Sequence, residues 1–262
     1  MSLIGQTQTT HQAQERTPPV RAGSALTDAL TDTLTDNLAD TLESHAAAWT
    51  VLSQLLGSIP ADDVLDRVRD PQLLETWPLG LSDPATRRGL RLWARSRERG
   101  EAASTVEPDY RRVFHGPGRV PAPPYESVHV GVDGLVFDAE TVAVRSFYRR
   151  FGLEVARVNR DPDDHVSPEL ELLATLAVRA LDVIDELEAP SRDGDPAVPP
   201  LVVDLVQGIG AFLDDHVLAW VPRFGELLSE YAQTDFVAGL GHLLVGTLRQ
   251  SADVFASPVT NP

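Results

Sequence analysis

Apolar residues recur along most of the chain at intervals of three and four, the spacing that places them on one face of an α-helix. The first such stretch has leucines at every fourth position from Leu26 to Leu42 and continues through Trp49 to Gly57. It predicts a long first core helix. Threonine and aspartate fill the intervals between the leucines and form helices weakly, so we expect its first turns to depend on packing.

Proline and glycine mark the ends of the later predicted helices. Asp83 followed by Pro84 is typical of an N-cap with proline at the first helical position, and Leu90 and Trp93 then face inward. Ser167 and Pro168 open the most regular helix in the same way, with Leu173, Leu176, Ala180, Ile184 and Leu187 on its buried face. Residues 61–79 predict a short acidic helix and a loop around Trp77-Pro78. Other helices are predicted from about 108, and at 137–151, 201–219, 223–232 and 234–255, with Pro222 as an interruption or kink.

Strand patterns are nearly missing, since only Ser127 to Val132 could form a short extended segment. The sequence therefore predicts an all-α, single-domain bundle of about eight to ten helices over residues 24–255. Residues 1–23 are rich in Gln, Thr and Pro and predict a disordered leader. Residues 189–200 form a predicted internal linker, and 256–262 a loose tail.

A proline-rich loop over residues 110–130 breaks the helical pattern. Proline lacks a backbone N–H and restricts the residue before it, so Gly116-Pro117 and the prolines from Pro121 to Pro124 cannot continue a helix. A stiff, shaped loop is expected. Tyr125 lies in this loop, and Tyr110 and Phe114 share one side of the helix before it. These rings either line an apolar groove for a flexible peptide or close the core beneath the loop, and the residues alone leave both open.

Composition narrows the class of protein. The 262 residues carry 39 acidic and 22 basic side chains, all of the basic ones arginine, for a net charge of -17 that indicates a high-salt or high-GC source. Such a surface repels nucleic acid. There is no cysteine, which excludes disulfides and thiolate sites. No apolar run approaches the roughly 20 residues that span a bilayer, and no signal peptide is evident. We expect a cytoplasmic monomer or homodimer without stable membrane association.

One predicted helix carries a basic face on this acidic chain. Its arginines are Arg87, Arg88, Arg91, Arg95, Arg97 and Arg99. They either form a solvated face that pairs with neighbouring carboxylates or bind a ligand.

Two clusters of acidic residues and histidine are candidates for metal ligands. Asp163-Asp164-His165 precedes Glu169, and Asp214-Asp215-His216 lies within a predicted helix. Neither has the repeated Glu-x-x-His spacing of metal sites in helical bundles. Asp164 could instead accept backbone N–H bonds ahead of the helix that starts near Ser167, and His165 could bond locally. A metal-dependent helical hydrolase remains an alternative, as does a scaffold or dimerisation protein acting through the leucine repeat.

Three segments together resemble the TorD/DmsD/NarJ group of redox-enzyme maturation chaperones. The first, Tyr110 to Val128, is similar to the family's aromatic-x-x-x-Phe, Gly-Pro and Pro-Pro-aromatic-x-Ser-Val pattern. The second, Asp161 to Leu173, is similar to its Glu-Pro-x-Asp-His and Glu-Leu motifs. The third, Phe212 to Phe224, is similar to Leu-x-x-His-x-x-x-Trp-x-Pro-x-Phe. The resemblance covers roughly residues 45 to 250.

The resemblance implies an all-helical cytoplasmic chaperone that has no catalytic activity and no cofactor of its own. Such a protein binds the twin-arginine signal peptide and the apo form of a molybdopterin oxidoreductase, of the DMSO, TMAO or nitrate reductase type, and aids cofactor insertion before export. The client is not specified. Tyr125 stands where the family often has tryptophan, and Asp161 where it has glutamate, which leaves the preferred partner open.

The resemblance also implies two sets of residues. Those implied for signal-peptide binding are Tyr110, Phe114, Pro123, Pro124, Tyr125, Glu126, Asp164 and His165. Those implied to be structural are Gly116, Pro117, Ser127, His216, Trp220 and Pro222. The rings would take the apolar stretch of the peptide, and Glu126 and Asp164 would meet its arginines.

Overall fold

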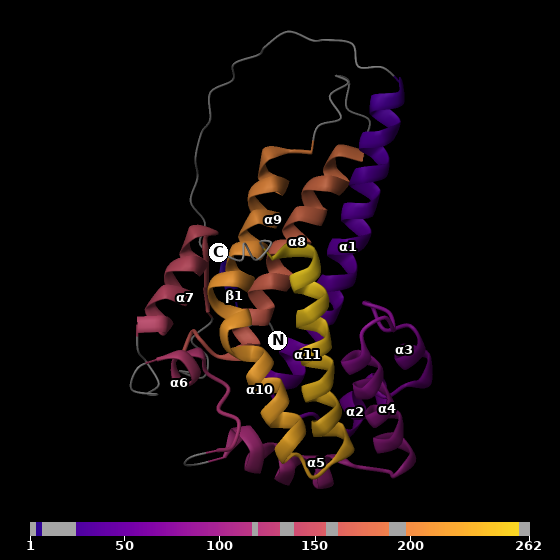
Figure 1. The fold of residues 1–262 in the computed structure, drawn as a ribbon, viewed down its shortest axis with the longest axis vertical. Helices are drawn as coiled ribbons and strands as arrows, with labels where there is room; N and C mark the ends of the chain where they lie inside the picture. Colours follow the sequence, from indigo (N-terminus) through magenta and orange to yellow (C-terminus); the bar gives the residue numbers. More distant parts are fainter. Residues whose placement is uncertain are drawn as a thin grey trace, which may run out of the picture.

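Long helices form the centre of the molecule in a computed structural model, which describes residues 4–6, 25–116, 120–131, 139–155, 162–188 and 198–256. They are α1 (Ala25–Gly57), α8 (Val166–Glu188), α9 (Pro200–Phe212), α10 (Leu218–Tyr231) and α11 (Asp235–Phe255). α1 runs beside α8, and α11 packs on α10 and on α4 (Pro84–Glu98) (Figure 1). The predicted all-α class is confirmed. No described helix is long and apolar enough to cross a membrane.

Shorter elements surround this centre. The helices are α2 (Asp62–Val68), α3 (Pro71–Glu75), α5 (Ala103–Tyr110), α6 (Glu126–Val130) and α7 (Ala139–Arg150), with two wide π-helical turns, η1 (Arg111–His115) and η2 (Leu213–Val217). Two short strands, β1 (Ile4–Gln6) and β2 (Leu153–Val155), pair antiparallel, which the sequence did not predict. The rest of the predicted leader, residues 189–197 of the linker and most of the tail lie outside the described residues, so those predictions stay predictions.

The core contains the residues that the helical spacing assigned to it. Leu42, Trp49 and Leu56 of α1 are fully buried, as are the predicted apolar positions of α8 up to Ile184. The side chain of Leu187 lies outside the described residues. Each large side chain removed from water contributes about 2 kcal/mol, so the α1–α8 contact is a main source of stability.

α4 approaches α11 closely because glycines lie at their crossing. A Cβ added at Gly89 would lie 2.6 Å from Cγ of Leu243 and 2.8 Å from the carbonyl oxygen of Gly239. As predicted, Asp83 caps α4 by accepting the backbone N–H of Thr86 at 2.9 Å, and Trp93 is buried. The backbone of α4 is therefore held firmly against α11.

Three local predictions are wrong. Ser127 to Val130 lie in α6 rather than in an extended segment. α8 begins at Val166, so Ser167 is not its cap; the backbone N–H of Ser167 instead donates to Nδ1 of His165 at 3.1 Å. Pro222 does not interrupt a helix, because it lies inside α10, and the α-helical pattern is broken earlier, at η2. A wide turn just before proline accommodates the lost backbone hydrogen bond.

Candidate functional site

The proline-rich loop is tied to the segment before α8 by backbone hydrogen bonds. Tyr125 and His165 form an isolated antiparallel bridge. The N–H of Glu126 donates to the carbonyl of Asp164 at 3.0 Å, and the N–H of Val166 donates to the carbonyl of Pro124 at 3.0 Å. The first and second family segments, about forty residues apart in sequence, therefore meet at this point.

Asp164 holds the start of α6. It is fully buried, and its Oδ2 accepts the backbone N–H of Ser127 at 2.9 Å while its Oδ1 accepts the hydroxyl of Thr141 at 2.8 Å. The first N–H groups of a helix need acceptors from outside the helix, and a carboxylate is a strong one. The sequence suggested that Asp164 accepts backbone N–H bonds at a helix start. It does so, but at the start of α6 rather than of α8. Thr141 belongs to no motif that could have identified it from the sequence.

His165 lies between the loop and α8. Its ring meets the ring of Tyr125 edge to face, with centroids 5.1 Å apart, and its Nδ1 accepts from Ser167. Burial, and next the nearby ring of His115, lower the pKa of His165 to about 4, although Asp164 acts in the opposite direction. His165 is therefore neutral near pH 7 and serves as a hydrogen-bond acceptor.

Two more buried carboxylates lie beneath the loop and bond to the third family segment. Nδ1 of His216 lies 3.1 Å from both oxygens of Glu126, and Nε1–H of Trp220 donates to Oε2 of Glu169 at 3.1 Å. Oε1 of Glu169 is buried without a partner among the described residues. Burial, followed by the charges of Glu126 and Asp164, raises the pKa of Glu169 well above its usual value. Burial therefore favours the protonated form of Glu169 within this polar cluster.

The rings before the loop lie in the core. Tyr110 and Phe114 are both buried, the hydroxyl of Tyr110 donates to the carbonyl of Leu55, and Phe114 meets Phe224 edge to face at 6.0 Å. Of the two roles left open by the sequence, the structure places both rings beneath the loop. They support it and do not line an open groove.

The surface above the cluster is partly apolar. Pro123 and Tyr125 are half-buried, and Pro124 is buried. Val130 at the end of α6 is 43% exposed, and Val142 on the neighbouring α7 is 59% exposed. We call Pro123, Tyr125, Val130 and Val142 the loop surface.

Glu126 and Asp164, which were expected to meet the arginines of a peptide, are buried and already bonded within the protein. Asp214 and Asp215 are exposed on η2, next to His216, which contacts Glu126 from below. Both side chains reach the surface near the loop.

Two other family-motif residues, Gly116 and Trp220, have packing roles. A Cβ at Gly116 would lie 2.4 Å from the carbonyl oxygen of Arg111, so the close turn after η1 requires glycine. Trp220 is buried, and its ring lies 5.1 Å from that of His129. His129 in turn donates from Nε2 to the carbonyl of Pro123 at 2.7 Å and so fixes the loop. Pro117 lies outside the described residues.

Among the described residues, the acidic and histidine side chains do not combine as metal ligands. No group of three or more such side chains suited to a metal ion occurs in the part of the chain that the structure describes. The two oxygens of Asp164 and Nδ1 of His165 already accept hydrogen bonds from the protein. The arrangement is that of a polar cluster that shapes a loop.

Comparison with known proteins gives consistent matches. The sequence profile of the nitrate reductase delta subunit family matches residues 81–226. The chain is 26% identical to a probable Tat proofreading chaperone DmsD of Haemophilus influenzae, over 77% of this chain and 88% of that protein. It is 28% identical to a selenate reductase assembly chaperone protein of Thauera selenatis, over 68% and 89%. It is 23% identical to a chaperone protein TorD of Vibrio parahaemolyticus, over 58% of this chain and 64% of that protein.

Proposed function

The chain belongs to the nitrate reductase delta subunit family, within the TorD/DmsD/NarJ group of maturation chaperones, and from this premise we propose that it is a chaperone for a molybdopterin oxidoreductase. It binds the twin-arginine signal peptide and the apo form of that enzyme in the cytoplasm and delays export until the cofactor is inserted. The relatives are named as chaperones and not as enzymes, which favours binding over catalysis.

One observation carries the proposal: the half-exposed ring of Tyr125 is held on a loop that is bonded on both sides to the segment before α8. A surface whose shape is fixed before binding loses less conformational entropy when a flexible peptide is captured. Tyrosine offers a large contact area with only two side-chain torsions to order, and valines extend the apolar area. The loop surface therefore suits the apolar stretch of a signal peptide.

The arginine-bearing end of the peptide requires exposed carboxylates. Glu126 and Asp164 are buried and bonded within the protein. In this proposal the arginines of the peptide therefore bind Asp214 and Asp215 on η2. The buried contact between Glu126 and His216 places the turn carrying these aspartates next to the loop. Guanidinium groups form their strongest hydrogen bonds with carboxylates, and two neighbouring aspartates match two neighbouring arginines.

A synthetic twin-arginine signal peptide of a molybdoenzyme, labelled with a fluorophore, tests the proposal by anisotropy. Tyr125→Ala should weaken binding by about tenfold or more, as expected for an aromatic anchor. Tyr231→Ala is the matched control, because Tyr231 is a half-exposed tyrosine at the end of α10. Asp215→Asn should weaken the same peptide but not a version in which both arginines are replaced by glutamine.

Circular dichroism and thermal melting show whether each variant is folded, so a loss of affinity can be separated from unfolding. Unchanged affinity for Tyr125→Ala and Asp215→Asn would refute the site. Equal losses in Tyr125→Ala and Tyr231→Ala would do the same. Affinity purification from the source organism, followed by identification of the bound oxidoreductase, would name the client.

A further inference from the structure

A second surface lies on α4, on the other side of the bundle from α6 and α7 (Figure 1). Arg88, Arg91 and Arg95 are exposed there, although the chain as a whole has a net charge of -17. We call these three residues the α4 arginine face. With Leu92, Ala94 and Glu98 they line a hollow of about 420 Å³.

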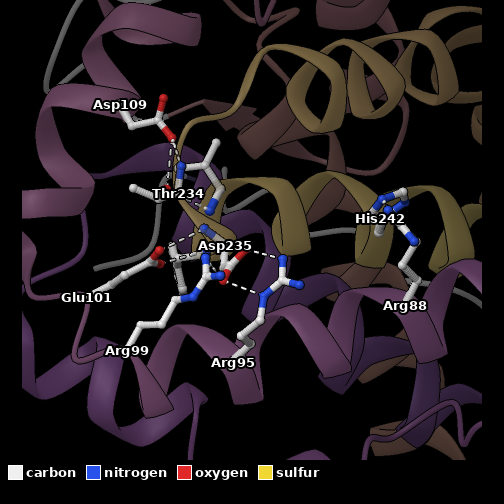
Figure 2. Close-up of polar contacts among 10 residues, drawn as sticks. Arg88, Arg95, Arg99, Glu101, Asp109, Thr234, Asp235 and His242 are labelled. Atoms are coloured by element: carbon white, nitrogen blue, oxygen red, sulfur yellow. Dashed lines mark hydrogen bonds and ion pairs between the residues drawn. The ribbon is translucent and has the colours of Figure 1, made fainter.

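Part of the basic charge near this face is neutralised within the protein. Arg95 and Arg99 converge on Asp235 at the start of α11 (Figure 2), with Nε of Arg95 2.6 Å from Oδ2 and Nη1 of Arg99 2.8 Å from the same oxygen. One carboxylate therefore serves two guanidinium groups. The sequence alternative of pairing with neighbouring carboxylates is correct for these two residues.

Two other acidic side chains, Glu101 and Asp109, are already occupied by the backbone at the start of α11, whereas Glu98 lines the hollow beside the arginines. Glu101 accepts the N–H groups of Asp235 at 2.9 Å and Phe236 at 3.0 Å, and Asp109 accepts the N–H and the hydroxyl of Thr234, both at 2.8 Å (Figure 2). These carboxylates satisfy the first donors of a long helix. They are bound in place and do not turn toward α4.

Arg88 and Arg91 form no ion pair with a carboxylate of the described residues. Nε–H of Arg88 donates to Nε2 of His242 at 2.9 Å (Figure 2), and burial and the charge of Arg88 lower the pKa of His242. His242 thus offers a lone pair but no negative charge. Arg91 forms no hydrogen bond or ion pair with any described residue. Both arginines retain N–H donors for a partner.

The backbone beneath the α4 arginine face is held in place, and its three arginines are regularly spaced along the helix. The glycine crossing fixes α4 on α11, and positions 88, 91 and 95 span about 10 Å along one side of the helix. Carboxylates at intervals of three and four on another helix have the same spacing. A partner helix laid along α4 would bring its acidic side chains to the arginines.

We propose that the α4 arginine face is a docking surface for an acidic helical segment of a partner protein. A single small anion would pair with solvated guanidinium groups on an open surface, which gives little binding energy, whereas several carboxylates on one helix add their contributions. Nucleic acid would be repelled by the rest of the chain. This inference does not rest on the signal-peptide proposal, because it concerns a different surface.

The test uses the full chain and a labelled, acetylated peptide of 16 residues that is alanine-rich and has glutamates at helical intervals of three and four. Fluorescence anisotropy should give saturable binding that falls steeply between low and high salt. The double variant Arg88→Gln/Arg91→Gln should bind about five- to tenfold more weakly. Arg95 is left unchanged because its bond to Asp235 belongs to the fold.

Arg67→Gln/Arg223→Gln is the matched control, since it removes the same charge from two exposed arginines elsewhere. It should leave the affinity within about twofold of the native value. Equal weakening in both double variants would show a general charge effect and would overturn the proposal. So would the lack of saturable binding to the native protein, equal affinity for the peptide with glutamine in place of glutamate, or tighter binding of inorganic phosphate or of a DNA oligonucleotide.

Discussion

Replacing Glu169 with glutamine should stabilise the protein, and more strongly as the pH rises. Glu169 is fully buried beneath the loop, with Glu126 and Asp164 close enough to raise its pKa. In the folded protein it keeps its proton, whereas in the unfolded chain it loses that proton above its usual pKa of 4.5. Folding at higher pH must therefore take up a proton, which costs free energy.

The size of the stabilisation follows from the proton that Glu169 takes up on folding. Above pH 4.5 each pH unit lowers the free energy of unfolding by about 1.4 kcal/mol through Glu169 alone, until its folded pKa is reached. Glutamine has the shape of the protonated acid and still accepts Nε1–H of Trp220. The difference in stability between Glu169→Gln and the native protein should therefore grow by about 1 kcal/mol from pH 5 to pH 6.

Urea denaturation at a series of pH values measures this difference. Glu43→Gln, at an exposed position of α1, is the control for a change of one charge, and it should show no such growth. A difference between Glu169→Gln and the native protein that does not change with pH would refute the protonated state of Glu169. A loss of several kcal/mol at every pH would show that the carboxylate is needed as an ion.

Three other substitutions test the cluster and the helix crossing. Asp164→Ala should lower the free energy of unfolding by about 3 to 5 kcal/mol, because it leaves the N–H of Ser127 and the hydroxyl of Thr141 buried without an acceptor; a loss below about 1 kcal/mol in urea would contradict this. His165 alone should lower the free energy of unfolding by about 3 kcal/mol as the pH drops from 6.5 to 4, since the unfolded chain protonates it first. Because Glu169 acts in the opposite direction over part of this range, the effect is read in urea as the difference in stability between His165→Gln and the native protein, which should grow by about that much toward pH 4. Gly89→Ala should cost about 1 to 3 kcal/mol in thermal melting, because the new methyl group meets α11; an unchanged melting temperature would show that the crossing can open.

The sequence predicted the helices because their apolar faces are buried in one core. The spacing from Leu42 to Leu56 and from Leu173 to Ile184 reflects contact between α1 and α8, and both sets are buried. The β1–β2 pair could not be predicted, since three residues per strand carry no periodic signal. The start of α8 could not be predicted either. The group that accepts a backbone N–H there is the ring of His165, and histidine is not one of the usual N-cap residues.

The family motifs identified the residues of the site. They did not show whether each side chain faces the core or the surface. Tyr110 and Phe114 share a helical side, which is equally consistent with a groove and with a core, and only the position of Phe224 across the bundle decides between them. Likewise, the sequence alone does not show whether the carboxylate of Asp164 is free to bind a partner. Its acceptors are used by Ser127 and Thr141, which come from two other elements.

The buried cluster explains how an exposed loop rich in proline can keep one shape. Proline removes backbone donors that would tie the loop to itself, so side chains around the loop add to its backbone hydrogen bonds with the segment before α8. Asp164 from the segment before α8, His129 from α6 and His216 from η2 form these additional bonds, and the bonds of Asp164 and His216 are buried. Tyr125 is the ring that this frame holds at the surface. A change beneath the loop that leaves the frame bonded, such as Glu169→Gln, should therefore alter stability with pH but not peptide affinity, whereas Asp164→Ala should alter both.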